Sequence, residues 1–251
     1  MKHIILILIS VCALCCTNNK QTQNSSDAFA VDSAIVNDTV KIGNSFYYFF
    51  NYHLLVFPTI KDKNLLDSIY KPVDIKVFDY SKEGLLSAIK DDIKNNVKDI
   101  DSVDVDELPD YFPDFDYSVE MKLISKAENL LIIEYNWGGY SGGAHGFYST
   151  FYKVVDLNIN KSISNTDIFK NINDKKLSEI LLNHLDEESK ECLFDTIPLN
   201  NNFYFDENSI TFVYNSYEIM PYACGMAEIT LPFVEINDYL KPEFVKQYLN
   251  K

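Results

Sequence analysis

The sequence contains no arginine: all 22 of its basic residues are lysines, set against 37 acidic residues. The guanidinium group is the side chain best suited to bind a phosphate or a nucleic-acid base through two hydrogen bonds, so its absence argues against nucleic-acid recognition. The net charge of -15 also repels nucleic acids and anionic lipids. A cationic partner is the partner class that this charge favours, and solubility alone is an equally good explanation of it.

Histidine is scarce as well, and no two of the four histidines have the i, i+4 spacing of a helical zinc site. Asp101, Asp104 and Asp106 resemble part of a calcium-binding loop, but the glycine and the terminal glutamate of an EF-hand are missing. A solvated acidic connection is the better interpretation of these three residues. The sequence therefore predicts no metal site and no cofactor.

A hydrophobic run long enough to span a membrane is missing too. The apolar stretch 4–11 is too short to cross a membrane. Together with Cys15 and Cys16, which follow it, this stretch makes residues 1–16 resemble a bacterial lipoprotein signal. We predict that Cys16 is the lipidated residue, with Cys15 or a plain secretory signal as alternatives. The polar residues 17–32 then form a flexible tether. This places the protein in the bacterial cell envelope, anchored to the outer membrane and facing the periplasm, with surface exposure as the alternative.

Cysteine is rare: after the predicted signal, the sequence contains only Cys192 and Cys224. Two cysteines in an exported chain can form a disulfide, and they can equally be two separate buried thiols. The sequence does not give their distance, so both alternatives stay open.

Aromatic and β-branched runs predict most of the strands. These runs lie at residues 46–50, 52–57, 115–124, 130–137, 147–157, 203–205, 210–214 and 227–231. Apolar residues at helical spacing predict helices at 81–99 and 173–188, and a shorter helix is expected within 238–249. Residues 27–40 are expected to be a polar lead-in to the first strand.

Strands interrupted by a few helices predict an α+β fold, with an antiparallel sheet and packed helices arranged in two lobes. Residues 99–116 contain eight acidic residues, two prolines and no lysine, which indicates an irregular connection. We place the boundary there, between an N-terminal lobe (33–112) and a C-terminal lobe (113–251).

Five of the eight glycines lie between positions 138 and 146, between two apolar runs, which predicts a hairpin with a long glycine-rich loop. The stretch 139–143 matches the G-x-S-x-G pattern of esterases, with Ser141 in the nucleophile position. That motif requires a helix after the serine, whereas this sequence predicts a strand, so a loop role is favoured. For His145, hydrogen bonding to the loop backbone is favoured over a catalytic role.

Aromatic side chains on loops can stack on sugars or anchor a protein partner, because they bring a large contact area at a small entropic cost. Tyr140 is the aromatic residue of this loop expected to be most exposed. A second segment, 216–226, contains a proline and a glycine that break the strand pattern and form a turn, where the side chains either line a site or brace the turn. The predicted binding residues are Trp137, Tyr140, Ser141, Gly142, Gly143, His145, Tyr217, Pro221 and Tyr222.

The order of these motifs resembles that of a family of exported domains of unknown function. The family includes the extracellular part of the anti-sigma-V factor RsiV and the N-terminal region of the peptidoglycan deacetylase PdaC. The resemblance covers residues 46–249 and rests on Gly-Gly-Ala-His145, Asp156-Leu-Asn158, Asp167-Ile-Phe169, Phe203-Tyr-Phe205 and Tyr217-Glu-Ile-Met-Pro-Tyr-Ala-Cys-Gly225. It implies a two-part α+β module that binds rather than catalyses, with lysozyme as the ligand in the anti-sigma factor.

The leading hypothesis is a lipid-anchored, non-catalytic domain that binds a cell-wall-related partner, either a cationic protein such as lysozyme or peptidoglycan. One alternative is a glycan- or ester-directed hydrolase with paired carboxylates. Two carboxylates facing each other in a cleft, one with a raised pKa, would favour that alternative. The other alternative is a structural lipoprotein without a ligand site.

Overall fold

The computed structural model describes residues 29–43, 46–127 without 102–112, and 129–249. The predicted signal, Cys15, Cys16 and most of the tether lie outside the described residues, as do Asp104 and Asp106. For Asp101 only the backbone is described.

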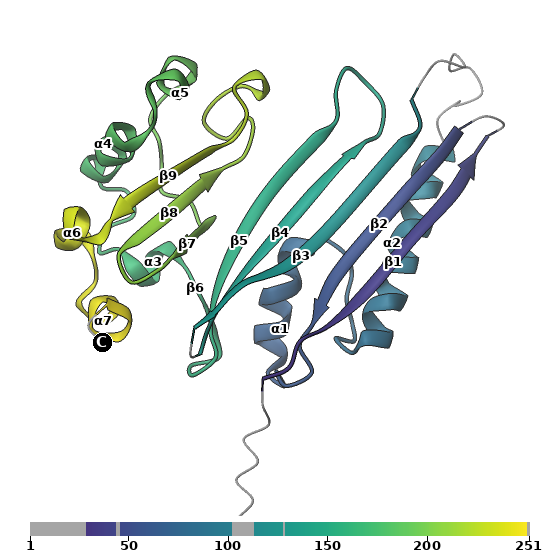
Figure 1. The fold of residues 1–251 in the computed structure, drawn as a ribbon, viewed down its shortest axis with the longest axis horizontal. Helices are drawn as coiled ribbons and strands as arrows, with labels where there is room; N and C mark the ends of the chain where they lie inside the picture. Colours follow the sequence, from purple (N-terminus) through teal and green to yellow (C-terminus); the bar gives the residue numbers. More distant parts are fainter. Residues whose placement is uncertain (1–28, 44–45, 102–112, 128, 250–251) are drawn as a thin grey trace, which may run out of the picture.

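The chain forms two β-sheets, and the larger one has six strands in chain order. Its strands are β1 (Asp32–Ile42), β2 (Phe46–Val56), β3 (Phe115–Ala127), β4 (Leu130–Tyr140), β5 (Phe147–Asp156) and β6 (Lys161–Ile163). The smaller sheet is antiparallel and consists of β7 (Phe203–Phe205), β8 (Ser209–Tyr214) and β9 (Ala227–Pro232). The predicted α+β class is confirmed (Figure 1).

One pair of strands departs from the expected antiparallel sheet, because β2 and β3 run parallel. Parallel neighbours need a long crossover, and here it contains α1 (Lys63–Tyr70) and α2 (Lys82–Asp101). The predicted helix over 81–99 is confirmed as α2: the Ser81 hydroxyl accepts the Gly84 N–H at 3.1 Å, and Leu85, Ile89 and Ile93 are buried.

The polar lead-in expected over residues 27–40 is wrong, because β1 begins at Asp32 and pairs with β2 along its whole length. Ala34 and Ile42 of β1 are fully buried, while Val36 and Val40 pack against the same core. These side chains alternate with outward-facing ones, which are polar except for the exposed Ile35, and this is the period of a strand with one buried face. The many polar residues of this edge strand concealed that period.

The helices of the second half are short. They are α3 (Asn165–Ile168), α4 (Lys175–His184), α5 (Glu187–Cys192), α6 (Phe233–Ile236) and α7 (Pro242–Phe244), the last followed by a π-helical turn, Val245–Leu249. The single helix expected over 173–188 is two helices: Leu185 ends α4, and the Asp186 carboxylate accepts the Ser189 N–H at 2.8 Å to begin α5.

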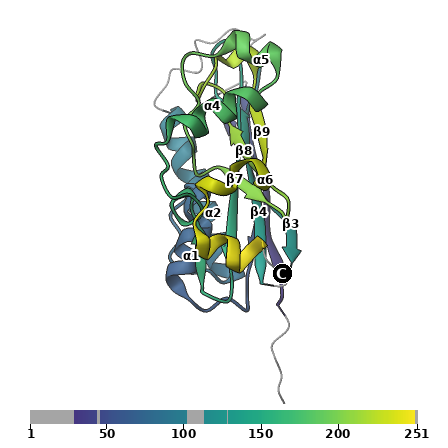
Figure 2. The same ribbon diagram turned by 90° about the vertical axis from the view of Figure 1, so that its left-hand side faces the viewer.

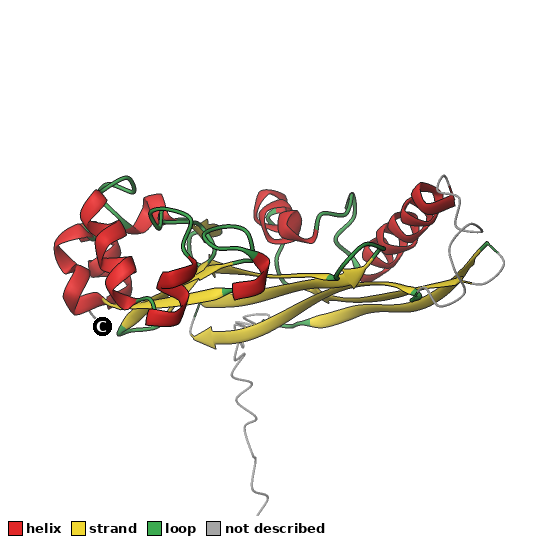
Figure 3. Ribbon diagram, turned by 90° about the horizontal axis from the view of Figure 1, so that it is seen from above, coloured by secondary structure: helices red, strands yellow, loops and turns green. Residues whose placement is uncertain are grey.

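The helices α1 and α2 cover one face of the large sheet and leave most of its other face open. In Figure 3, α1 and α2 lie above the strands, and Figure 2 shows the same separation from the side. The second core covers Leu130, Ile132 and Val154 on this other face, and the rest of the face presents its alternate side chains to solvent.

Two hydrophobic cores lie along this layer. The first contains residues of β1–β5, α1 and α2, and the second contains residues of β7–β9 and the later helices. The boundary expected at residues 112–113 lies between β2 and β3, which are neighbours in one sheet, so both expected lobes contribute strands to that sheet. The cores meet at β5, where Val155 belongs to the first and Val154 to the second.

Candidate functional site

The glycine-rich segment forms the expected hairpin loop between β4 and β5, over residues 141–146. Gly142 and Gly143 have φ angles of 101° and 95°, which favour glycine. The Tyr140 hydroxyl donates to the Gly143 carbonyl at 2.9 Å, and His145 Nδ1 lies 2.7 Å from the Gly146 carbonyl oxygen. Strand β5 follows directly, so Ser141 is an exposed loop residue without the strand–turn–helix context of a nucleophile elbow.

The second segment connects β8 to β9 and is held by several constraints. Tyr217 has a φ of 71°, unusual for a bulky residue, and its N–H donates to the Met220 carbonyl at 2.9 Å. Pro221 precedes a 3-10 turn, Tyr222–Cys224. A disulfide joins Cys224 to Cys192 of α5, with their Cα atoms 6.4 Å apart.

These two loops meet through their aromatic rings. The His145 ring stacks on Tyr222 with the centroids 3.9 Å apart, and the rings of Tyr148 and Tyr217 each lie 5.9 Å from that of Tyr222. Tyr217 is 61% exposed and Tyr148 is 43% exposed. We call these four residues the aromatic end cluster, because both loops lie at one end of the molecule (Figure 1).

Two of the predicted residues lie away from this cluster. Trp137 points from β4 into the first core, where its ring packs edge-on against Phe151 with centroids 4.9 Å apart. Tyr140 is partly buried and braces its own loop, so the most exposed tyrosines around these two loops are Tyr217 and Tyr148 rather than Tyr140. Tyr148 is missing from the predicted set, although its position directly after the loop was a signal for it.

A row of polar side chains crosses the open face of the large sheet. His53 Nδ1 lies 3.9 Å from Glu120, Lys122 bonds Glu120 at 2.8 Å, and Lys122 also lies 3.8 Å from Glu134. The Tyr152 hydroxyl donates to Glu134 at 2.7 Å. Burial and the Glu134 carboxylate raise the pKa of Tyr152, so its phenol stays protonated and acts as a donor.

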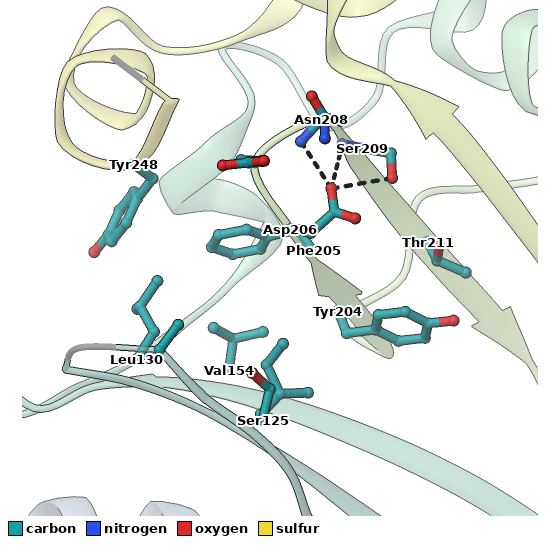
Figure 4. A pocket seen from close by; sticks show the side chains of 13 residues that line it. Ser125, Leu130, Val154, Tyr204, Phe205, Asp206, Asn208, Ser209, Thr211 and Tyr248 are labelled. Carbon is teal, nitrogen blue, oxygen red and sulfur yellow. Dashed lines mark hydrogen bonds between the residues drawn. The ribbon is translucent and has the colours of Figure 1, made fainter. Parts of the chain in front are cut away.

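A cleft of about 460 Å³ lies where the start of β4 faces the β7–β8 hairpin. Figure 4 shows Leu130 and Val154 on one side, Tyr204 and the Asp206 turn on the other, and Tyr248 closing a third side. No local pattern indicated this cleft, because its walls come from segments that are distant along the chain. The full lining is Ser125, Ala127, Leu130, Ile132, Val154, Tyr204–Ser209, Thr211 and Tyr248.

Two groups of described carboxylates, at Asp92 and in the cleft, differ from the facing pair expected for a hydrolase. Burial raises the pKa of Asp92, but its carboxylate accepts the Tyr52 hydroxyl at 2.5 Å and the Asn96 amide at 3.1 Å, so it joins α2 to the sheet. In the cleft, Asp206 and Glu207 are consecutive residues of one turn rather than residues of opposite walls.

The chain is an α+β domain with a mixed six-stranded sheet, a smaller antiparallel sheet and helices on one side. Residues 165–234 match the family described as "Protein of unknown function (DUF3298)". The match begins at α3 and ends in α6, so it contains the whole second sheet. This part of the chain is consistent with a DUF3298 family domain.

One curated relative confirms the resemblance to PdaC. The chain is 27% identical over 233 residues to the peptidoglycan-N-acetylmuramic acid deacetylase PdaC of Bacillus subtilis (strain 168). The match covers 81% of this chain and 49% of that protein, so the chain spans about half the length of its curated relative.

Two solved structures share the fold. A DUF3298 family member from Bacteroides fragilis NCTC 9343 matches with a TM-score of 0.68 and 24% identity, over 87% of this chain and 96% of the other. A DUF3298 family protein from Pseudomonas aeruginosa PAO1 matches with a TM-score of 0.61 and 17% identity, over 90% of this chain and 99% of the other. Within the described residues, no helix has the length and apolarity needed to cross a membrane.

Proposed function

We propose that this chain is a non-catalytic binding domain of the bacterial cell envelope and that its aromatic end cluster binds the glycan strands of peptidoglycan. The stacked rings of His145 and Tyr222, flanked by the exposed Tyr148 and Tyr217, carry this proposal. Tyrosine rings offer a flat apolar face for a sugar ring and a hydroxyl for its polar edge. The relative PdaC is named for an activity on peptidoglycan, which supports a wall-related ligand.

The constraints on the cluster favour binding because they lower its entropic cost. The disulfide at Cys224 and the hydrogen bond from Tyr217 to Met220 hold the second loop, while the Tyr140 hydroxyl holds the first. Side chains ordered before a ligand arrives lose less freedom when it binds. The backbone of Tyr217 has the kind of uncommon conformation that often occurs at binding sites.

The proposed location follows from the predicted signal and tether. A lipid on Cys16 would hold the domain at the outer membrane, facing the periplasm, and the polar residues 17–32 would let it reach the wall. Peptidoglycan lies in that compartment, so the proposed anchor and the proposed ligand agree.

A second candidate partner is a cationic protein such as lysozyme. The net charge of -15 favours it, because an acidic surface accelerates the encounter with a basic protein. Exposed Glu218 lies on the same loop as Tyr217, and α5, tied to this loop by the disulfide, begins with Glu187 and Glu188.

The test measures retention of residues 27–251 on insoluble peptidoglycan, in parallel with binding to purified lysozyme at low and high salt. A variant with Tyr148→Ala, Tyr217→Ala and Tyr222→Ala should bind peptidoglycan at least about tenfold more weakly, because the loss of the rings costs more than about 1.4 kcal/mol. The matched control is Phe78→Ala, which removes an aromatic ring that is 77% exposed elsewhere.

Unchanged retention of the triple variant would show that the cluster is not the glycan site. Saturable lysozyme binding that survives moderate salt, without retention on peptidoglycan, would favour the second candidate. Lysozyme binding that disappears as salt is added would be simple charge attraction.

A further inference from the structure

We propose that the cleft between the two sheets is a second binding site, and that it accepts a primary ammonium group on a short apolar chain, such as a lysine side chain or an alkylamine. This proposal does not depend on the glycan site. The cleft lies at the start of β4 and the aromatic end cluster lies beyond its end. Eleven residues of strand separate the two sites by roughly 30 Å.

The walls of the cleft suit the apolar part of such a ligand. Leu130, Ile132 and Val154 form one side, and the rings of Phe205 and Tyr248, with centroids 5.8 Å apart, also line the cleft (Figure 4). The volume of about 460 Å³ is within the range of small-ligand sites and exceeds that of one alkyl chain. An extended side chain can therefore enter with its apolar stem against these walls.

The rim of the cleft suits the charged end. Asp206 and Glu207 are exposed on the β7–β8 turn that borders the opening. One oxygen of Asp206 accepts the N–H groups of Asn208 and Ser209 at 2.7 and 2.8 Å, which fixes that carboxylate in place. The rings of Tyr204 and Tyr248 add faces on which an ammonium group can rest.

Among the described residues, no lysine lines this cleft. The two lysines of the neighbouring strand β3 are engaged elsewhere: Lys126 lies over the ring of Phe29 at 5.3 Å, and Lys122 pairs with Glu120 at 2.8 Å. The described lining thus combines two carboxylates with aromatic side chains and contains no cationic side chain. A cationic ligand can pair with the carboxylates and contact the aromatic rings at the same time.

The experiment titrates the full-length chain with n-pentylammonium chloride and with the neutral n-pentanol, and follows backbone amide shifts of the β7–β8 turn by NMR. The expected result is saturable binding of pentylammonium with shifts at Asp206–Ser209 and much weaker binding of pentanol. Glu207→Gln should weaken pentylammonium binding about fivefold, as expected for one exposed charge contact. The control Glu188→Gln removes an exposed charge from α5 and should leave the affinity unchanged.

A second variant tests the location without removing a charge. Ala127 is exposed at the edge of the cleft, so Ala127→Trp should fill the opening and abolish pentylammonium binding while the protein keeps its fold. Equal binding of pentanol and pentylammonium, or binding that survives Ala127→Trp, would overturn the proposal. Nα-acetyl-lysine-N-methylamide distinguishes the sources: its binding points to a lysine side chain, and binding of pentylammonium alone points to a free amine.

Discussion

Tyr222 and His145 show how single side chains acquire a role in this molecule. Each lies in a loop whose local sequence only marks a turn, and their rings meet because β5 and the second sheet bring the two loops together. The resulting stack covers both rings on one side and leaves Tyr217 and Tyr148 exposed beside it. A local sequence pattern can suggest such residues as candidates, but only long-range contacts bring them together into one surface.

Gly139 is required for a reason that its neighbour Gly138 does not share. A Cβ atom on Gly139 would lie 2.3 Å from the Asp116 carbonyl oxygen in the paired strand, whereas on Gly138 the nearest atom, Ser118 Oγ, would be 3.5 Å away. The first distance forces the backbones of β3 and β4 apart. We therefore expect Gly139→Ala to lower the free energy of unfolding by about 1–3 kcal/mol, the usual cost of overpacking.

Urea denaturation of the two alanine variants measures this difference. Gly138→Ala is the matched control and should change the free energy of unfolding by less than about 1 kcal/mol, because its contacts are ordinary. An equal loss in both variants would mean that the close approach of β3 to β4 is not the cause.

Among the elements, the edge of β5 is completed by side chains instead of a strand. β6 pairs only with its last three residues, and the free backbone groups before them bond to two buried asparagines. Asn202 accepts the Tyr152 N–H at 2.7 Å and donates to the Thr150 carbonyl at 2.8 Å, while Asn215 accepts the Thr150 N–H at 2.7 Å. These amides connect the large sheet to the small one.

Removal of one of these amides should therefore destabilise the junction. Asn202→Ala leaves the Tyr152 N–H without its partner, whereas the Thr150 carbonyl keeps the Asn215 amide at 3.1 Å. We expect the free energy of unfolding to fall by about 1–3 kcal/mol. Thermal or urea unfolding measures this loss. The control is Asn51→Ala, at an exposed position of β2, which should change the free energy of unfolding by less than about 0.5 kcal/mol. A loss as small as that of the control would show that water replaces the amide.

For the molecule as a whole, the β4–β5 hairpin ties the two cores together. Leu131, Ile133 and Tyr135 of β4 belong to the first core, while Leu130 and Ile132 pack against the second. Neither core can lose its structure without exposing one face of this hairpin. We therefore predict one cooperative unfolding transition for the described domain.

Two probes test this cooperativity. Fluorescence of Trp137, the only tryptophan, reports on the first core, and hydrogen exchange of the β8 amides reports on the second. Both should give the same urea midpoint. Separate midpoints would show that the two cores unfold independently.

Local periodicity predicted most of the regular elements, whereas features that depend on long-range pairing were not predicted. Strong periodic segments such as α2 and the strands β3–β5 follow from the spacing of their apolar residues, and the α+β class follows from their order. β1 was missed because its outer residues are polar, and the parallel β2–β3 pair was missed because strand direction depends on the crossover.

The sequence by itself determined the absence of arginine, the acidic balance, the aromatic strands and the two loops that carry tyrosines, since these depend on composition and local periodicity. Only the tertiary structure decided that His145 stacks on Tyr222, that Trp137 faces the core, and that segments from both sheets enclose a cleft. The physical reason is that a surface or a cleft is made by contacts between distant segments. Those contacts depend on how the faces of the sheets and helices pack, which no short stretch of sequence specifies.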